Sequence, residues 1–190
     1  MKRLMTLAAI AALVGALTSA SAQEGAFLNN RVMVDGLYKR NIGNFSSVWS
    51  GAVGGYVGYG IAFPKHNLLV MRSGVIKNML RDGVPYDGAT STVIPVHIGG
   101  RYYFTDATLM PFVSFMNGLN VVFENTNLEG DQKSRTLVKY AWEVGVGLTV
   151  NLGEVVALDA RANYQSHFYQ TDAMMTGFEY TLGLAWNLPR

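Results

Sequence analysis

The chain contains no cysteine, and beyond its first residues it has no long hydrophobic run. The absence of cysteine from 190 residues excludes a disulfide framework and a thiolate metal site. After residue 22 no apolar stretch approaches the roughly 18 residues that a transmembrane helix needs. The 3 histidines are scattered along the chain, which makes a poor metal site. We therefore expect no metal and no cofactor.

Charge is also scarce, and it is balanced. The chain begins with Lys2-Arg3, an apolar run over 4–17 and the small residues Ala20-Ser21-Ala22, which is the pattern of a secretory signal peptide. We predict a signal peptide over 1–22 and one domain over 23–190. Without Lys2 and Arg3, the 15 basic residues become 13 and equal the 13 acidic residues. The predicted mature chain is thus formally neutral and lacks the basic field of a nucleic-acid-binding protein.

A strict alternation of side chains is the strongest positive signal. From Val138 to Leu152 every even position is large and apolar, and every odd position is small, polar or charged. A period of two places successive side chains on opposite faces of a strand. The same parity continues through Tyr164 and through Trp186. One apolar and one polar face over about ten residues per strand is what a membrane-spanning β-barrel requires.

Eight strand-like segments can be found along the chain. They cover residues 26–40, 46–64, 67–80, 90–104, 109–124, 136–152, 154–170 and 174–188. The first is the least regular, since Val32, Met33 and Val34 are consecutive and Asp35 interrupts them. Short turns at 64–67, 105–107 and 152–154 alternate with longer connections at 41–45, 81–89 and 125–135 and a shorter one at 170–173.

Outer-membrane barrels have an even strand number, short periplasmic turns and longer outer loops. We therefore predict an all-β fold, a single eight-stranded antiparallel up-and-down transmembrane β-barrel. The alternation of connections puts the amino terminus in the periplasm. The predicted location is the outer membrane of a Gram-negative bacterium, reached through the signal peptide.

Two segments carry a resemblance to a known family. Leu68–Val75 reads LLVMRSGV, and Ile94–Phe104 reads IPVHIGGRYYF and is followed by Met110-Pro111-Phe112-Val113. Over most of the predicted mature chain the sequence resembles small outer-membrane β-barrels of the OmpA/OmpX and PorT-like type. The resemblance implies partners of two kinds, outer-membrane lipid and the barrel-assembly machinery, and it brings no catalytic residues. We expect a monomer that is not an enzyme.

Charged side chains share the polar parity and should face the interior. The interior of an eight-stranded barrel is just wide enough for side chains, and unpaired charges there would be costly. Glu143 and Arg161 should lie near each other across adjacent strands. His97 and His167 also face inward by parity. We predict that a charge network plugs the lumen, with the members Arg72, Arg101, Lys139, Glu143, Asp159, Arg161 and Glu179.

Aromatic residues gather toward the ends of the predicted strands. An aromatic ring with a polar tip is satisfied at the boundary between lipid and water. We predict an aromatic girdle formed by Trp49, Phe63, Tyr102, Phe104, Phe168 and Trp186.

These patterns favour a structural or surface-interaction role. The polar outer connections at 81–88 and 124–133 are placed to meet an extracellular ligand. Ser166 and His167 are adjacent in a strand and point to opposite faces, so they cannot act as a catalytic pair. Two alternatives stay open. One is a small gated pore through the charged groups. The other is a soluble secreted lipid carrier, in which the apolar parity would line a cavity.

Overall fold

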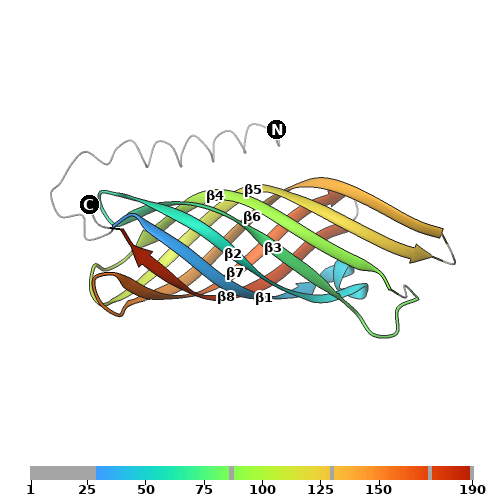
Figure 1. Cartoon of the computed structure of the whole chain (residues 1–190), viewed down its shortest axis with the longest axis horizontal. Helices are drawn as coiled ribbons and strands as arrows, with labels where there is room; N and C mark the ends of the chain where they lie inside the picture. The colour runs from blue at the N-terminus through green and yellow to red at the C-terminus, as the bar shows by residue number, and fades with distance from the viewer. Residues whose placement is uncertain (1–28, 86–87, 129–130, 171–172, 189–190) are drawn as a thin grey trace.

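The computed structural model is a closed antiparallel barrel in which each strand pairs with its neighbours in sequence and β8 pairs with β1 (Figure 1). The structure describes residues 29–85, 88–128, 131–170 and 173–188. The predicted signal peptide lies outside these residues. The strands are β1 (Arg31–Ile42), β2 (Trp49–Phe63), β3 (Asn67–Leu80), β4 (Thr90–Tyr103), β5 (Leu109–Leu128), β6 (Asp131–Asn151), β7 (Val156–Gln170) and β8 (Ala173–Asn187).

The predicted fold class is confirmed, and the two ends of the barrel differ as expected. Short connections at 64–66, 104–108 and 152–155 lie at one end, which we call the turn end. The 3₁₀ helix η1 (Gly43–Ser47) and the connection 81–89 lie at the other end, which we call the loop end. Within the described ranges, no helix is long and apolar enough to cross a membrane.

The predicted connection over 125–135 is wrong, because most of it is strand. β5 runs to Leu128 and β6 begins at Asp131, with Glu124 opposite Arg135 in the register. The Arg135 and Glu124 side chains form an ion pair of 2.6 Å across this hairpin, and such cross-strand pairs favour strand pairing. The hairpin extends beyond the other strands at the loop end (Figure 1).

The first strand is regular, although its sequence looked interrupted. β1 alternates between buried and outward residues along its whole length. Asp35 is one of the buried positions, and its carboxylate lies 3.6 Å from the Arg161 guanidinium. The residue that appeared to break the pattern therefore belongs to the interior face.

Trp49 is a correction to the predicted girdle. A register shift between Trp49 and Gly51 makes Ser50 an extra residue in β2. Such a bulge reverses the side to which the preceding side chains point. Trp49 is consequently 4% exposed and packs with Phe45 and Met175 inside the loop end, while Ser50 is exposed.

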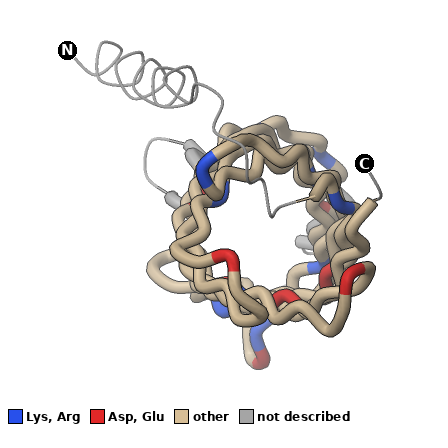
Figure 2. Tube along the Cα trace, turned by 90° about the vertical axis from the view of Figure 1, so that its left-hand side faces the viewer, with Lys and Arg blue, Asp and Glu red and all other residues tan. Residues whose placement is uncertain are grey.

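The register fixes the width and tilt of the barrel. Following directly paired residues once around the ring from Arg31 returns to β1 at Asn41, ten residues further along the strand. Ten residues span about 33 Å along a strand, and eight strands span about 38 Å around the ring. The strands therefore tilt by about 40°, within the range usual for barrels. Figure 2 shows the closed ring along its axis.

Two neighbouring glycines in β4 differ in the space around them. A Cβ on Gly99 would lie 2.0 Å from the Phe115 carbonyl oxygen and 2.6 Å from the Met116 Cα. A Cβ on Gly100 would have only the Leu68 carbonyl oxygen nearby, at 4.0 Å. Gly99 is therefore required where β4 and β5 approach closely.

We expect Gly99→Ala to lower the free energy of unfolding by about 1–3 kcal/mol, because backbone atoms must move to admit the methyl group. Gly100→Ala is the matched control and should change it by less than about 0.5 kcal/mol. Urea unfolding of both variants in phospholipid vesicles measures the difference. Equal stability of the two variants would contradict the assignment.

Candidate functional site

The outer wall of the barrel is apolar, and the interior holds the charges. Val146 is 61% exposed and Leu182 is 60% exposed. Asp159 and Glu179, which have the opposite parity, are 3% and 0% exposed. From Val138 onward, the even-numbered apolar residues thus cover the outside. This orientation excludes the soluble lipid carrier, which needs the reverse arrangement.

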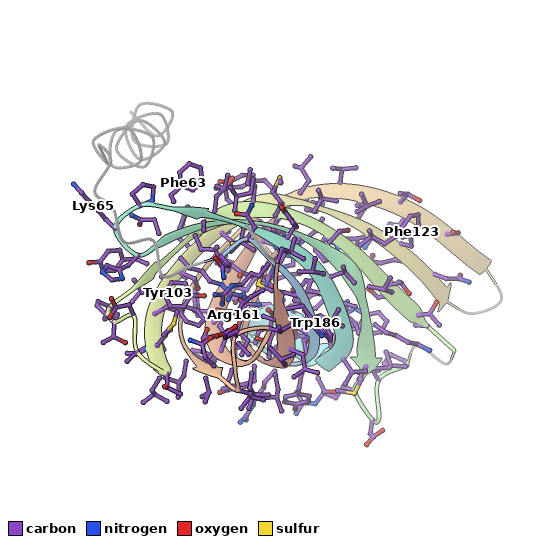
Figure 3. The ribbon with its side chains drawn as sticks, turned by 60° about the vertical axis from the view of Figure 1, so that its left-hand side comes forward. Phe63, Lys65, Tyr103, Phe123, Arg161 and Trp186 are labelled. Carbon is purple, nitrogen blue, oxygen red and sulfur yellow. The ribbon has the colours of Figure 1, made fainter. Side chains whose placement is uncertain are left out.

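Most of the predicted girdle lies at the turn end of this wall. Phe63 is half-buried, and Tyr102, Phe104 and Trp186 are more than a third exposed. The rings of Tyr102 and Phe104 meet edge to face, with centroids 5.5 Å apart. Figure 3 shows Phe63 on the outside of the barrel. The side chain of Phe168 lies outside the described residues.

A second aromatic group, which sequence reasoning missed, lies toward the loop end. The Tyr164 ring is 5.8 Å from that of Trp142 and 5.7 Å from that of Phe178. Phe178 and Trp186 are eight residues apart on β8, which is about 26 Å along the strand. At a tilt of about 40°, the two aromatic groups lie about 20 Å apart along the barrel axis. This spacing is close to the apolar band of about 25 Å in outer-membrane barrels.

The centre of the lumen is organised around Arg72. Its guanidinium forms an ion pair with Glu143 and lies 3.6 Å from Glu179. It also stacks 3.8 Å above the Tyr56 ring, and the Tyr56 hydroxyl donates to Glu179 at 2.8 Å. All of these side chains are buried. The arrangement satisfies a charge that would otherwise be costly at this depth.

A second ion pair lies closer to the turn end. Arg101 Nη1 donates to Asp159 Oδ2 at 2.5 Å, and the Thr149 hydroxyl donates to the other carboxylate oxygen. The Arg101 guanidinium stacks on Phe112, 4.7 Å from the ring centroid. The pair is therefore held by hydrogen bonds and by an aromatic face.

Glu143 and Arg161 interact electrostatically, but the predicted diagonal offset between them is wrong. In the register Glu143 lies opposite Gln165 and Arg161 lies opposite Gly147, so the two residues are four positions out of step. Glu143 instead pairs with Arg72 across the lumen, and Arg161 lies near Asp35. The prediction considered only residues of the neighbouring strands β6 and β7. In a narrow barrel, side chains of distant strands also meet across the lumen.

Lys139 was also predicted in the network, and the structure places it at the edge. It is half-buried in β6, toward the loop end. The buried lysine is Lys39 of β1, which is 2% exposed and donates to Gln165 at 2.7 Å. Lys39 and Asp35 share the parity of Arg31, and that alternation is the signal that could have found them.

The charges in the middle of the lumen balance. The buried cations there are Lys39, Arg72, Arg101 and Arg161, and the buried carboxylates are Asp35, Glu143, Asp159 and Glu179. Figure 3 shows Arg161 inside the ring of strands. The equal numbers are consistent with a closed, internally compensated network.

Two histidines extend this polar layer. The Asn120 side chain lies between them, 2.9 Å from His97 Nε2 and 2.7 Å from His167 Nδ1. Lys39 Nζ lies 3.4 Å from His167 Nε2. Among the described residues, no group of three His, Cys, Asp or Glu side chains is placed to hold a metal ion.

Apolar layers lie toward both ends of the lumen, beside charged groups. The turn-end layer is formed by Met33, Leu68, Val70, Tyr103, Met110, Phe112 and Met116, with Ala157 and Ala185. The buried guanidinium groups of Arg31 and Arg101 lie over its Tyr103 and Phe112 rings. A middle cluster of Leu37, Ala52, Tyr56, Ile76, Val93 and Val122 packs beside the charges. The loop-end layer is formed by Phe45, Trp49, Ala89 and Met175. Phe45 belongs to η1, so this helix folds over the mouth of the barrel.

With this geometry in view, comparison with known proteins is informative. No protein-family model and no curated protein matches the sequence. Several solved structures match its shape (TM-scores 0.61, 0.61 and 0.58) at low identity. Neisserial surface protein A is 14% identical, and the match covers 84% of this chain and 97% of that one. Ail, the attachment invasion locus protein of Yersinia pestis, is 15% identical, and the match covers 85% of this chain and 99% of Ail. OprG from Pseudomonas aeruginosa is 9% identical, and the match covers 89% of this chain and 100% of OprG.

The fold is that of the small outer-membrane β-barrels. The resemblance read from the sequence is thereby confirmed at the level of the fold. The narrower OmpA/OmpX and PorT-like assignment stays a prediction, because identities of this size report architecture alone.

Removal of one partner from the Arg101–Asp159 pair tests the plug. We expect Arg101→Met to lower the free energy of unfolding by about 3–5 kcal/mol, because Asp159 would be left buried without its partner. The double variant Arg101→Met/Asp159→Asn should recover more than half of this loss. Urea unfolding of the folded barrel measures both values. If the loss of stability in the double variant equals the sum of the losses in Arg101→Met and in Asp159→Asn, the two side chains do not act as a pair.

Proposed function

We propose that this chain is an integral protein of the bacterial outer membrane, in which a sealed barrel presents the loop end at the cell surface for interaction. The observation that carries the proposal is the apolar wall, nearly free of charge and bounded by two aromatic groups, around a charged lumen filled by side chains. The wall suits hydrocarbon, and ring closure satisfies the backbone groups that lipid cannot. The turn end would then face the periplasm.

The sealed lumen favours a scaffold over a pore. A channel needs a continuous open path, whereas packed charged and apolar side chains fill the lumen here. The Arg72–Glu143 and Arg101–Asp159 pairs are hydrogen-bonded, and parting them would leave charges uncompensated. We further propose that the protein has no catalytic activity, since His97 and His167 contact amide and lysine groups and lie away from the surface.

The surface role draws on the loop end. The β5–β6 hairpin extends past its neighbouring strands, and rigid scaffolds commonly carry binding segments of this kind. One structural neighbour, Ail, was solved in complex with the heparin analogue sucrose octasulfate. A protein with the same fold can thus bind an extracellular ligand, which supports a similar role for this chain.

Insertion into lipid is the first test. Val146 lies midway along the apolar wall, so Val146→Arg should lower the free energy of unfolding in phosphatidylcholine vesicles by about 2–4 kcal/mol. Val146→Ala serves as the control for loss of the side chain without added charge. Urea titration of the vesicle-bound protein gives both values. Equal folding of the arginine and alanine variants would mean that this face does not contact hydrocarbon.

Conductance separates the scaffold from the gated pore. We expect the purified barrel to give no current steps in a planar bilayer, because both apolar layers close the lumen. Trp49→Ala, which opens only the loop-end layer, should also stay silent. A steady conductance of the wild-type protein, reduced by Glu143→Ala, would establish the pore instead.

A further inference from the structure

Charge is nearly absent from the outward-facing positions of the strands. Among the strand residues whose side chains the structure describes, only Arg40 of β1 and Lys77 of β3 place a charged group on the outer wall. Both are exposed, and both are basic. Among the described outward-facing strand residues, no acidic side chain lies beside them, so no carboxylate on the wall neutralises their positive charge.

The two cations lie on the same side of the barrel, with β2 between them. Arg40 of β1 lies opposite Gly51 of β2. Lys77 of β3 lies opposite Val53, which is two residues further along β2. Two strand spacings and a two-residue offset separate their Cα atoms by about 12 Å. Arginine and lysine have long side chains that can bridge this distance and meet over one anion.

The wall between them carries hydroxyl groups. Gly51 is buried, and a Cβ there would lie 2.7 Å from the Lys39 carbonyl oxygen, 3.0 Å from Met79 Cε and 3.7 Å from the Tyr38 hydroxyl. Tyr38 is exposed, and so is Ser50, the extra residue of the bulge. The surface between the two cations is therefore closed by packed atoms and presents hydroxyl groups on its outside.

The depth of Arg40 matches the edge of the apolar wall. Arg40 is opposite Phe178 of the loop-end aromatic group, and Val32 is opposite Trp186 of the turn-end group. Arg40 and Val32 are eight residues apart on β1, about 26 Å along the strand. A cation placed at such an interface costs about 0–1 kcal/mol, far less than at the midplane. Headgroups rather than acyl chains would lie at this level.

We propose that Arg40 and Lys77, with the Tyr38 hydroxyl, bind a phosphate group on the headgroup of an outer-leaflet lipid. This inference rests on the proposed function, because it needs the barrel to be inserted with its loop end outward. Guanidinium and ammonium groups donate several charge-assisted hydrogen bonds to phosphate oxygens. The site would hold one lipid on the β1–β3 side and fix that side of the barrel relative to its membrane neighbours.

The test uses the folded mature barrel with phosphatidic acid, a lipid with a phosphate monoester, as the probe. Native mass spectrometry of the detergent-extracted protein, titrated with this lipid, gives the Kd of the first bound molecule. We expect Arg40→Gln/Lys77→Gln to weaken this binding roughly tenfold to thirtyfold, since each interfacial cation near anionic lipid contributes about 1 kcal/mol. Lys65→Gln/Arg81→Gln removes the same net charge from connections outside the wall and should stay within about twofold of the wild type.

Three results would overturn the site. One is unchanged binding in Arg40→Gln/Lys77→Gln, and another is equal weakening in both double variants, which would indicate general charge attraction. The third is displacement of the lipid by an equal concentration of inorganic phosphate, which would assign the two cations to the free ion. Failure of the barrel to insert into neutral phosphatidylcholine vesicles would instead contradict the proposed function, because those vesicles contain no phosphate monoester.

Discussion

Closure of the backbone ring is the constraint on which the rest of the structure depends. A closed ring of strands with a shift of ten residues fixes a narrow interior, and every second side chain must then enter it. The same closure satisfies the backbone hydrogen bonds of every strand, so the outer wall needs no polar groups. Side-chain alternation then sorts the chain into a charged inside and an apolar outside. The ion pairs of the lumen and the apolar character of the outer wall both follow from that sorting.

The lumen shows how a narrow barrel accommodates buried charge. Arg72 is surrounded by two carboxylates and an aromatic face, and Arg101 by a carboxylate and another ring. The packed lumen keeps water from these groups, which strengthens each ion pair and also raises the cost of breaking one. The interior is therefore a rigid filling. Any interaction with other molecules is left to the outer wall and the loop end.

The sequence predicted the architecture because period-two alternation is a local property. Strand number and most strand bounds followed from it, except over 125–135, and the parity of Asp159 and Glu179 placed them inside. The alternation did not predict which charged side chains pair inside the lumen. Arg72 reaches Glu143 across the barrel, and the local sequence pattern does not specify contacts between distant strands. Trp49 was misplaced because a one-residue bulge reverses parity without a clear mark in the sequence. Lys39 was missed because the consecutive apolar residues Val32–Val34 hid the alternation of β1.

The central claim is that the even-numbered apolar residues from Val138 onward touch hydrocarbon while their odd-numbered neighbours do not. The chain has no cysteine, so a nitroxide can be attached at Val146→Cys, Leu182→Cys or Thr181→Cys without background labelling. Relaxation by oxygen, which concentrates in lipid, should exceed relaxation by a water-soluble nickel complex at positions 146 and 182, and position 181 should be shielded from both. Strong relaxation by the nickel complex at 146 and 182 would contradict the account.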